Sequence, residues 1–106
     1  MIASIWHGWS THANADAFEA LVKNEICPAL LAKEVAGFRS SQLLRLARAG
    51  QTEFICIGCF DDMDAVRALL GDDVDAKPML PPRALALLRR FDHQTQHFEV
   101  RETTGA

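Results

Sequence analysis

The 106-residue chain contains no tyrosine, although it has six phenylalanines and two tryptophans. This absence excludes any mechanism in which a tyrosine phenol acts as acid, base or radical relay. An excess of basic residues is also missing, because eleven Lys and Arg stand against fourteen Asp and Glu, for a formal net charge of -3. Proteins that bind nucleic acid need a basic surface to neutralise phosphates. We therefore expect no nucleic-acid partner.

Long apolar runs are absent as well, and no stretch approaches the ~20 residues that a membrane-spanning helix needs. The first nine residues carry no basic segment of the kind that opens a secretory signal. Cysteine is scarce and odd in number, with Cys27, Cys56 and Cys59, whereas small secreted domains commonly carry an even disulfide framework. These features predict a cytoplasmic protein with no membrane partner.

What is present is the composition of a folded domain. Hydrophobic residues make up 49% of the chain and charged residues 24%, which is ordinary for a soluble globular protein. The length suits one domain. We expect this domain to span residues 1–102, with residues 103–106 as a flexible tail.

The spacing of apolar residues predicts the order of the elements. β-Branched and aromatic residues favour a strand over residues 2–9, and apolar positions three and four apart predict a helix that reaches Ile26. Pro28 is expected to break or kink this helix, with a shorter helical turn over 29–35. The later elements are expected to be a hairpin (38–46 and 53–60), a helix (63–70), a short helix (83–90) and a half-buried strand (95–102).

This order is β-α-β-β-α-β with one extra short helix. It predicts an α+β protein of the ferredoxin-like plan, in which a four-stranded antiparallel sheet carries its helices on one face. Acidic residues Asp61, Asp62 and Asp64 stand where the second main helix begins, and we interpret them as capping groups rather than as a metal site.

Four segments carry a resemblance to a known family. They are residues 1–8 (MIASIWHG), 52–62 (TEFICIGCFDD), 64–73 (DAVRALLGDD) and 96–100 (QHFEV). Together, over about residues 1–101, they resemble the antibiotic biosynthesis monooxygenase-like proteins of the dimeric α+β barrel superfamily.

The resemblance implies a homodimer in which two sheets face each other and the helix-free face of each lines a cavity. Studied members oxidise polycyclic aromatic substrates without metal or flavin, or bind and degrade haem, and other members of the superfamily cyclise polyketides or isomerise lactones. It thus implies a cofactor-independent monooxygenase that takes an aromatic or polyketide-like small molecule and needs no cofactor and no metal.

The sequence departs from the family pattern at three places. Phe60 replaces a common tryptophan, the first strand lacks the asparagine of active oxygenases, and Phe98 stands where a tyrosine often follows the last histidine. The residues of the haem-degrading branch cannot be placed together either. Two alternatives therefore stay open: a non-catalytic small-molecule-binding or stress-related dimeric barrel protein, and a polyketide cyclase or isomerase.

Side chains alternate across a strand, so each strand can be divided into two faces. The residues expected under the helices are Ala3, Ile5, Leu44, Leu46, Ile55, Ile57, Cys59, Phe98 and Val100. The residues expected to form the site on the helix-free face are Trp6, Arg45, Phe60 and His97, with Ser4 and Cys56 behind them. The apolar part of that face, with Trp6, Phe54 and Phe60, predicts a homodimer because monomers rarely expose such a patch.

Two of these residues are candidate catalytic groups. His97 could move a proton, because imidazole titrates near neutral pH, and Arg45 could steady a substrate anion. Trp6 and Phe60 would hold a planar ligand, and His7, which faces away from Trp6, is a further candidate for substrate binding. The structural alternatives are a His97–Glu99 pair or dimer seam, an exposed edge arginine, and aromatic interface core.

Cys56 and Cys59 have the C-x-x-C spacing of redox and zinc sites. Such sites need both sulfurs to converge on a turn or helix start. Within a strand, an offset of three puts the two sulfurs on opposite faces. We therefore expect neither a metal nor a redox role for this pair.

Overall fold

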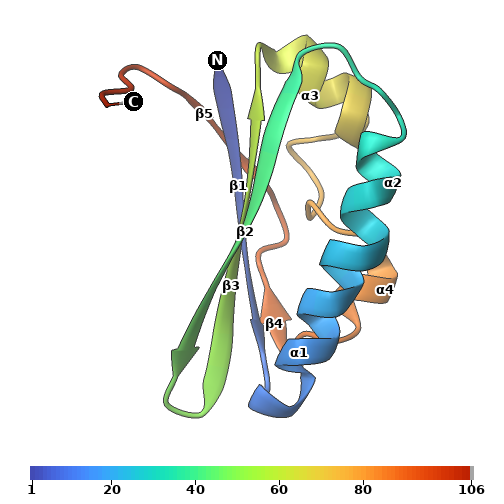
Figure 1. Ribbon diagram of the computed structural model, residues 1–106, viewed down its shortest axis with the longest axis vertical. Helices are drawn as coiled ribbons and strands as arrows, with labels where there is room; N and C mark the ends of the chain where they lie inside the picture. Colours follow the sequence, from blue (N-terminus) through green and yellow to red (C-terminus); the bar gives the residue numbers. More distant parts are fainter. Residues whose placement is uncertain (106) are drawn as a thin grey trace.

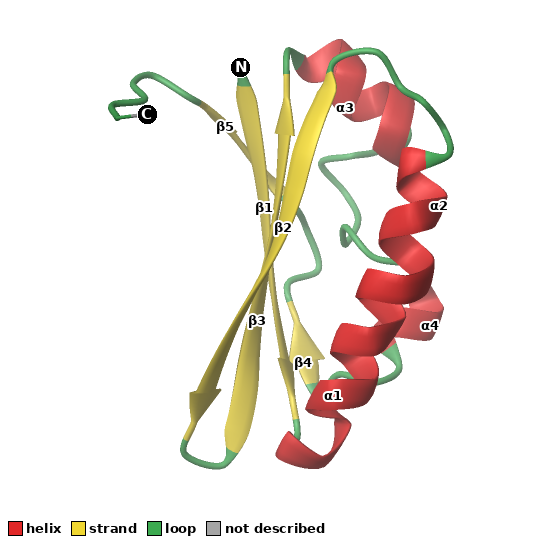
Figure 2. Cartoon of the chain, in the orientation of Figure 1, coloured by secondary structure: helices red, strands yellow, loops and turns green. Residues whose placement is uncertain are grey.

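One antiparallel sheet is covered on one face by a layer of helices in the computed structural model of the chain, which describes residues 1–105 (Figures 1 and 2). The elements are β1 (Ile2–Ser10), α1 (His12–Leu21), the π-helical turn η1 (Val22–Ile26), α2 (Cys27–Leu31), β2 (Phe38–Arg48), β3 (Gln51–Phe60), α3 (Met63–Leu70), α4 (Pro82–Leu85), β4 (Arg90–Phe91) and β5 (Gln96–Glu99). Residues 101–105 of the C-terminal segment have no regular secondary structure, and Ala106 of the expected tail lies outside the described residues.

The strand order confirms the predicted ferredoxin-like fold. The strands lie in the order β2-β3-β1-β4, and β5 also pairs with β1. Every pairing is antiparallel, and β1 pairs with β3 along its whole length, from Ile2 opposite Phe60 to Ser10 opposite Thr52. The hairpin of β2 and β3 turns at the end of the sheet opposite α3, the end where α1 begins (Figure 1).

The fourth predicted strand, expected over 95–102, is shortened to β5, and an additional two-residue strand, β4, precedes it. β4 pairs with the end of β1, and β5 pairs with its beginning. Between them the chain departs from the regular ladder, and side-chain hydrogen bonds join the backbone bond from the Asp92 amide to the His7 carbonyl. The Trp6 indole Nε1 donates to the Asp92 carbonyl at 2.6 Å, and the His7 amide donates to Asp92 Oδ2 at 3.2 Å.

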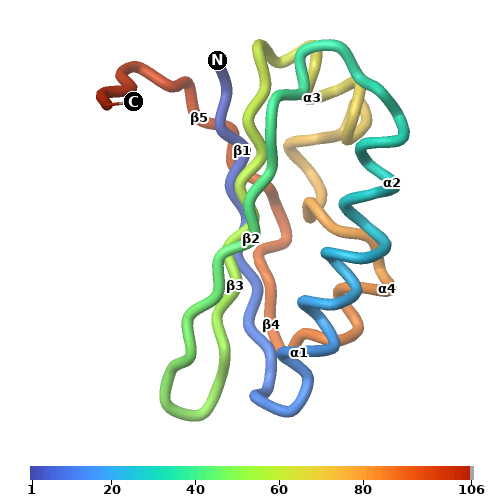
Figure 3. The backbone as a smooth tube through the Cα atoms, viewed as in Figure 1, coloured from blue at the N-terminus to red at the C-terminus, as the bar shows by residue number. Residues whose placement is uncertain are grey.

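The first helix is not broken at Pro28, where the sequence predicts a break or a kink. α1, η1 and α2 follow one another without interruption, and the tube through the Cα atoms runs on as one helix (Figure 3). Proline lacks an N–H but suits the first turn of a helical segment. Just before Pro28 the helical hydrogen bonds follow the wider π-helical pattern, in which the Cys27 amide donates to the Val22 carbonyl five residues back. The predicted helix over 83–90 is likewise shorter, a single turn from Pro82 to Leu85.

α3 begins at an acidic cap, as the sequence indicates. The Asp62 carboxylate accepts a hydrogen bond from the Ala65 amide at 2.9 Å. Asp61 has a different partner, since it accepts two hydrogen bonds from Arg39 at 2.7 and 2.6 Å. The helix ends at Gly71, whose φ of 102° is a conformation that residues with a side chain rarely adopt.

Removing this cap gives a first testable prediction. Asp62→Ala should lower the free energy of unfolding by about 1 kcal/mol, because the Ala65 amide loses its acceptor at the helix start. Asp64→Ala is the matched control, since the Asp64 side chain is 95% exposed and caps no amide. Urea unfolding followed by circular dichroism measures both. Equal losses in the two variants would contradict the capping role.

The two faces of the sheet are the reverse of those predicted. Trp6, Phe54 and Phe60 are buried under the helices, at 0, 0 and 2% exposure. Leu44, Leu46 and Phe98, expected in the core, lie on the helix-free side and are 43, 52 and 49% exposed. The face assignment from the sequence was therefore wrong for every strand.

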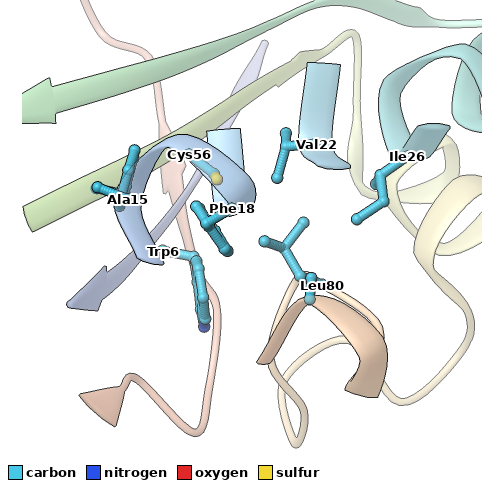
Figure 4. Close-up of a cluster of buried hydrophobic side chains, with 9 residues drawn as sticks. Trp6, Ala15, Phe18, Val22, Ile26, Cys56 and Leu80 are labelled. Atoms are coloured by element: carbon cyan, nitrogen blue, oxygen red, sulfur yellow. The ribbon is translucent and has the colours of Figure 1, made fainter. Parts of the chain in front are cut away.

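Glycines explain why the large rings fit beneath the helices. A Cβ at Gly8 would stand 2.7 Å from Leu88 Cδ1 and 3.0 Å from the Trp6 ring, and a Cβ at Gly58 would stand 2.9 Å from the Phe60 ring. The rings thus lie over positions that have no side chain. From α1, Phe18 packs against Phe54 with ring centroids 4.6 Å apart, and Figure 4 shows Trp6 and Phe18 within the same cluster.

Candidate functional site

The residues predicted to form the site do share one face of the sheet, but it is the helix-covered face. This face carries Ser4, Trp6, Arg45, Cys56, Phe60 and His97. His7 faces away from Trp6, as its place in the strand predicts, but because Trp6 lies under the helices His7 points to the helix-free side and not toward the helix layer as expected. The structure distributes the shared-face residues over separate groups rather than around a single cavity.

The aromatic pair is divided between two clusters of the core. Trp6 lies in the cluster beneath α1 and η1, whereas Phe60 packs beneath α3 with Val66 and Val74. Phe60 meets the Phe38 ring at 5.4 Å between centroids. Trp6 and Phe60 therefore do not form the two sides of one planar slot.

His97 and Ser4 form a buried hydrogen-bonded pair. His97 Nδ1 lies 2.6 Å from Ser4 Oγ, and His97 Nε2 lies 3.3 Å from the Val74 carbonyl and 3.9 Å from Asp75 Oδ1. A carbonyl can only accept, so Nε2 carries the hydrogen and Nδ1 accepts from the serine hydroxyl. The His97 side chain is 5% exposed. With this tautomer, His97 bonds to Ser4 on β1 and to the Val74 carbonyl, and so connects the segment after α3 to the sheet.

Arg45 joins the edge strand β2 to the first helix. Its Nη1 donates to Asp16 Oδ1 at 2.8 Å and to Glu19 Oε1 at 3.3 Å, and the guanidinium lies 5.7 Å from the centre of the Phe54 ring. The hydrogen bond to Asp16 raises the pKa of Arg45 above its usual value. The position of Arg45 on the edge strand agrees with the structural alternative, an exposed edge arginine. Its partner Glu19 also lines the cleft described next.

A cleft of about 530 Å³ opens between the helix layer and strand β2. Its lining consists of Glu19, Val22, Lys23, Cys27, Ser41 and Leu43. Behind it, a small, partly open void of about 40 Å³ shares four of these residues and reaches Cys56, Met79 and Leu80. The π-helical turn η1 supplies one wall through Val22, Lys23 and Ile26, and such turns occur often at functional sites.

Cys56 is the one predicted site residue that reaches this cavity. Burial, together with the neighbouring Cys27 thiol, raises the pKa of Cys56 to about 12. The thiol is therefore neutral at physiological pH and contributes an apolar surface rather than a nucleophile. Cys59 lies on the opposite face of β3, half-buried, as its spacing from Cys56 predicts. Over residues 1–105, no three His, Cys, Asp or Glu side chains are grouped to hold a metal ion.

The raised pKa gives a second prediction. In a Cys27→Ser, Cys59→Ser variant, iodoacetamide should modify the native protein at pH 8 at least ~100-fold more slowly than the urea-unfolded protein, because only the thiolate reacts. Mass spectrometry of quenched samples measures the rate. Modification of the folded protein at the unfolded rate would contradict the buried, neutral thiol.

A second group of polar residues, which the sequence interpretation missed apart from His7, lies on the helix-free face. His7 Nδ1 is 3.2 Å from Glu53 Oε2, and Arg48 Nε donates to Glu53 Oε1 at 2.6 Å. The signal that could have revealed it is the single carboxylate of Glu53 inside the apolar strand β3. The partners of Glu53 could not be read from the sequence, because His7 comes from β1 and Arg48 from β2.

None of the helices within residues 1–105 is long and apolar enough to cross a membrane. No protein-family model matches the sequence, and no curated protein does.

Solved structures, in contrast, are similar over nearly the whole chain. SnoaB, a cofactor-independent oxygenase from Streptomyces nogalater, is 23% identical with a TM-score of 0.56, over 96% of this chain and 95% of that chain. A single-residue variant of SnoaB is 25% identical with a TM-score of 0.59 and the same coverage. A variant of MhuD, with two manganese protoporphyrin IX molecules bound per active site, is 19% identical with a TM-score of 0.60 over the whole of both chains.

The likeness agrees with the strand order and with the single helix layer derived above. It also confirms the resemblance carried by the four sequence segments. The chain has the fold of the antibiotic biosynthesis monooxygenase-like proteins, in the dimeric α+β barrel superfamily.

Proposed function

We propose that this protein is a cofactor-independent monooxygenase that acts, as a homodimer, on an aromatic or polyketide-like small molecule. The observation that carries the proposal is its similarity, over 96% of the chain, to a cofactor-independent oxygenase. The cleft beneath η1 is the proposed substrate site. Its volume of about 530 Å³ lies within the usual range of ~300–1,000 Å³ for small-molecule pockets.

The lining of the cleft suits a planar molecule with an acidic hydroxyl. Val22 and Leu43 supply apolar walls, and Glu19 and Lys23 stand at the mouth with Glu19 Oε2 and Lys23 Nζ 4.0 Å apart. Oxygenation without a cofactor begins with loss of a proton from the substrate, which makes it electron-rich enough to reduce dioxygen. In this scheme Glu19 accepts the proton and the Lys23 ammonium stabilises the resulting anion.

The catalytic roles of His97 and Arg45 remain predictions within this scheme. Arg45 shares Glu19 with Lys23 and can steady a substrate anion from the edge of the cleft. His97 is enclosed by Ser4 and Val74. It can serve as a proton carrier only if the segment after α3 moves away from β5.

A homodimer is supported by the helix-free face, although through other residues than those predicted. The large apolar side chains on this face include Ile5, Trp9, Leu44, Leu46, Ile55, Ile57 and Phe98. Three of them are more than 40% exposed in the single chain. The reason for predicting a homodimer still applies, because helices on one side only leave an apolar sheet face that a second copy can cover.

A non-catalytic binding protein is the second candidate, and the charges at the cleft favour it. Glu19, the acid of the cleft lining, is paired with both Arg45 and Lys23. Cys56 behind the cleft stays neutral. Such a site can hold an apolar ligand without a free base to activate it.

Oxygen uptake by metal-free protein with a panel of aromatic hydroquinones tests the proposed function. We expect uptake with at least one compound and a loss of ~10-fold or more in Ser41→Trp, in which the indole fills the exposed mouth of the cleft. Leu31→Trp is the matched control, because Leu31 is 65% exposed on α2 and lies outside the cleft lining.

Two results would overturn the oxygenase proposal, and two others would change its site or its residues. Binding without uptake would favour the non-catalytic protein, and product formed under strict anaerobiosis would favour a cyclase or isomerase. Unchanged oxygen uptake in Ser41→Trp would show that the reaction does not take place in this cleft. Full turnover in His97→Ala would remove His97 from the mechanism.

A further inference from the structure

We propose that a groove in the helix layer binds a linear aliphatic carboxylate, whose chain lies along α2 and whose carboxylate meets Lys33 and Lys77. The groove has a volume of about 510 Å³, within the usual range of ~300–1,000 Å³ for small-molecule pockets. It shares no lining residue with the cleft beneath η1. This inference therefore goes beyond the proposed function and does not depend on oxygenase activity.

The groove stays accessible in the proposed homodimer. Its walls come from η1 and α2, from the end of α3 and from the segment 77–85, which contains α4. Figure 1 shows these elements together on the helix-covered side of the sheet. The second copy is proposed to cover the opposite, helix-free face, so it leaves the groove open.

One wall of the groove is a stripe along the first helix. Its lining residues are Ile26, Ala29, Leu30 and Lys33. Their spacing of three, four and seven residues puts them on one side of the helix. At 1.5 Å per residue the stripe is about 10 Å long, which matches an extended alkyl chain of eight to ten carbons. The lysine stands at one end of the stripe, so the chain and the charged group of the ligand have separate places.

The other wall is apolar and its backbone is restricted. It is formed by residues 77–83 (KPMLPPR), in which three prolines fix the backbone and provide no N–H. Met79 and Leu80 lie between the prolines, and Leu69 and Leu70 of α3 complete the apolar lining. None of the lining residues within 1–105 is aromatic. The groove therefore favours an aliphatic chain over the planar molecule proposed for the cleft.

All charged residues of the lining are basic, although the chain as a whole carries a net charge of -3. They are Lys33, Lys77 and Arg83. Arg83 is neutralised by Glu25, with Nη1 and Oε1 3.1 Å apart. Because Glu25 directly precedes Ile26, this pair lies at the other end of the stripe from Lys33. The carboxylate of the ligand is therefore expected at the lysines.

The two lysines approach the same end of α3. Lys33 Nζ donates to the Leu69 carbonyl at 3.3 Å, and a Cβ at Gly71 would stand 2.9 Å from Lys77 Nζ. Lys77 is paired with Asp73 at 3.1 Å, whereas Lys33 contacts no carboxylate among residues 1–105. Two ammonium groups against one carboxylate leave one positive charge. A ligand with a single carboxylate can neutralise it.

Calorimetric titration with decanoate, below its micelle concentration, tests the ligand class. We expect saturable binding, with decylammonium at least ~10-fold weaker because its charge would meet the lysines. The comparison is stringent, since the chains are of equal length and the negative net charge of the protein favours the cation in non-specific association. Equal or tighter binding of decylammonium, or no saturable binding of decanoate, would overturn the proposal. Binding to phosphatidylglycerol vesicles without binding of free decanoate would also overturn it, in favour of a membrane surface.

A pair of tryptophan variants tests the location of the site. Ala29→Trp fills the groove from its exposed side and should weaken decanoate binding ~10-fold or more. Ala32→Trp is the matched control, because Ala32 is also exposed but lies outside the lining. Circular dichroism shows whether both variants are folded. Equal effects of the two substitutions would place the ligand elsewhere and overturn the proposal.

A pair of charge variants tests the carboxylate site. The double variant Lys33→Gln, Lys77→Gln should weaken decanoate binding ~10-fold or more. The double variant Arg67→Gln, Arg101→Gln removes the same net charge from exposed positions outside the groove and should not. Equal losses in the two, or a loss in Ser41→Trp at the cleft, would overturn the proposal. Decanoate binding needs no oxygen uptake, so failure of this site and failure of the oxygenase proposal are distinguishable.

Discussion

Replacing Trp6 by alanine should lower the free energy of unfolding by about 3–5 kcal/mol, the usual cost of removing a large buried aromatic side chain. Trp6 is fully buried between the sheet and α1, in contact with the cluster that includes Phe18 and Phe54. The substitution also leaves the Asp92 carbonyl without the indole N–H that it accepts at 2.6 Å. Because this hydrogen bond holds the bulge between β4 and β5, we expect that segment to loosen first.

Trp9→Ala is the matched control for Trp6→Ala. It removes the same side chain from the same strand, but Trp9 lies on the helix-free face and is half-buried. Its loss should cost less than half as much. Urea unfolding with linear extrapolation measures both values. A Trp6→Ala protein within 1 kcal/mol of wild type that had lost ligand binding would restore the substrate-binding role predicted for Trp6.

Leu44→Glu should convert the proposed homodimer into a monomer. Leu44 lies in the apolar helix-free face, opposite Ile55 on β3. In a two-fold symmetric dimer each substitution occurs twice, and burying an unpaired carboxylate costs several kcal/mol. The dimer dissociation constant should therefore rise by at least ~100-fold, which sedimentation velocity across a concentration series can measure.

Leu31→Glu serves as the control for this experiment. Leu31 is more exposed than Leu44 but lies on α2, in the helix layer on the other side of the sheet. Its substitution should leave the dimer intact. A wild-type protein that sediments only as a monomer at micromolar concentration, or equal effects of the two substitutions, would contradict a dimer formed through the helix-free face.

Much of the fold could be predicted from the sequence because the signals are local. The Asp62 cap and the Gly71 terminus define α3, and the turn at Gly50 defines the hairpin of β2 and β3. In each case the residue that produces the signal acts within a few positions of itself. The order of elements then leaves few arrangements, and the ferredoxin-like sheet is the one observed.

The faces of the strands could not be predicted in the same way. On β3, Phe54 and Cys56 alternate with Ile55 and Ile57, so both faces are apolar and the alternation has no polar side to mark the exterior. The helix-covered face was decided by fit, since Phe18 of α1 packs on Phe54 and the Trp6 ring lies over Gly8. Such complementarity involves residues far apart in the chain. The candidate site predicted on the opposite face was consequently displaced into the core.

The sequence by itself determined the class of the fold, the two ends of α3 and the absence of a tyrosine phenol from any mechanism. The tertiary structure decided which side of the sheet the helices cover, and with it whether a residue is core or surface. It also brought His7, Glu53 and Arg48 together from three strands. The physical reason is that hydrogen bonds and caps form between near neighbours, whereas ring packing and side-chain networks depend on the relative positions of elements that only folding creates.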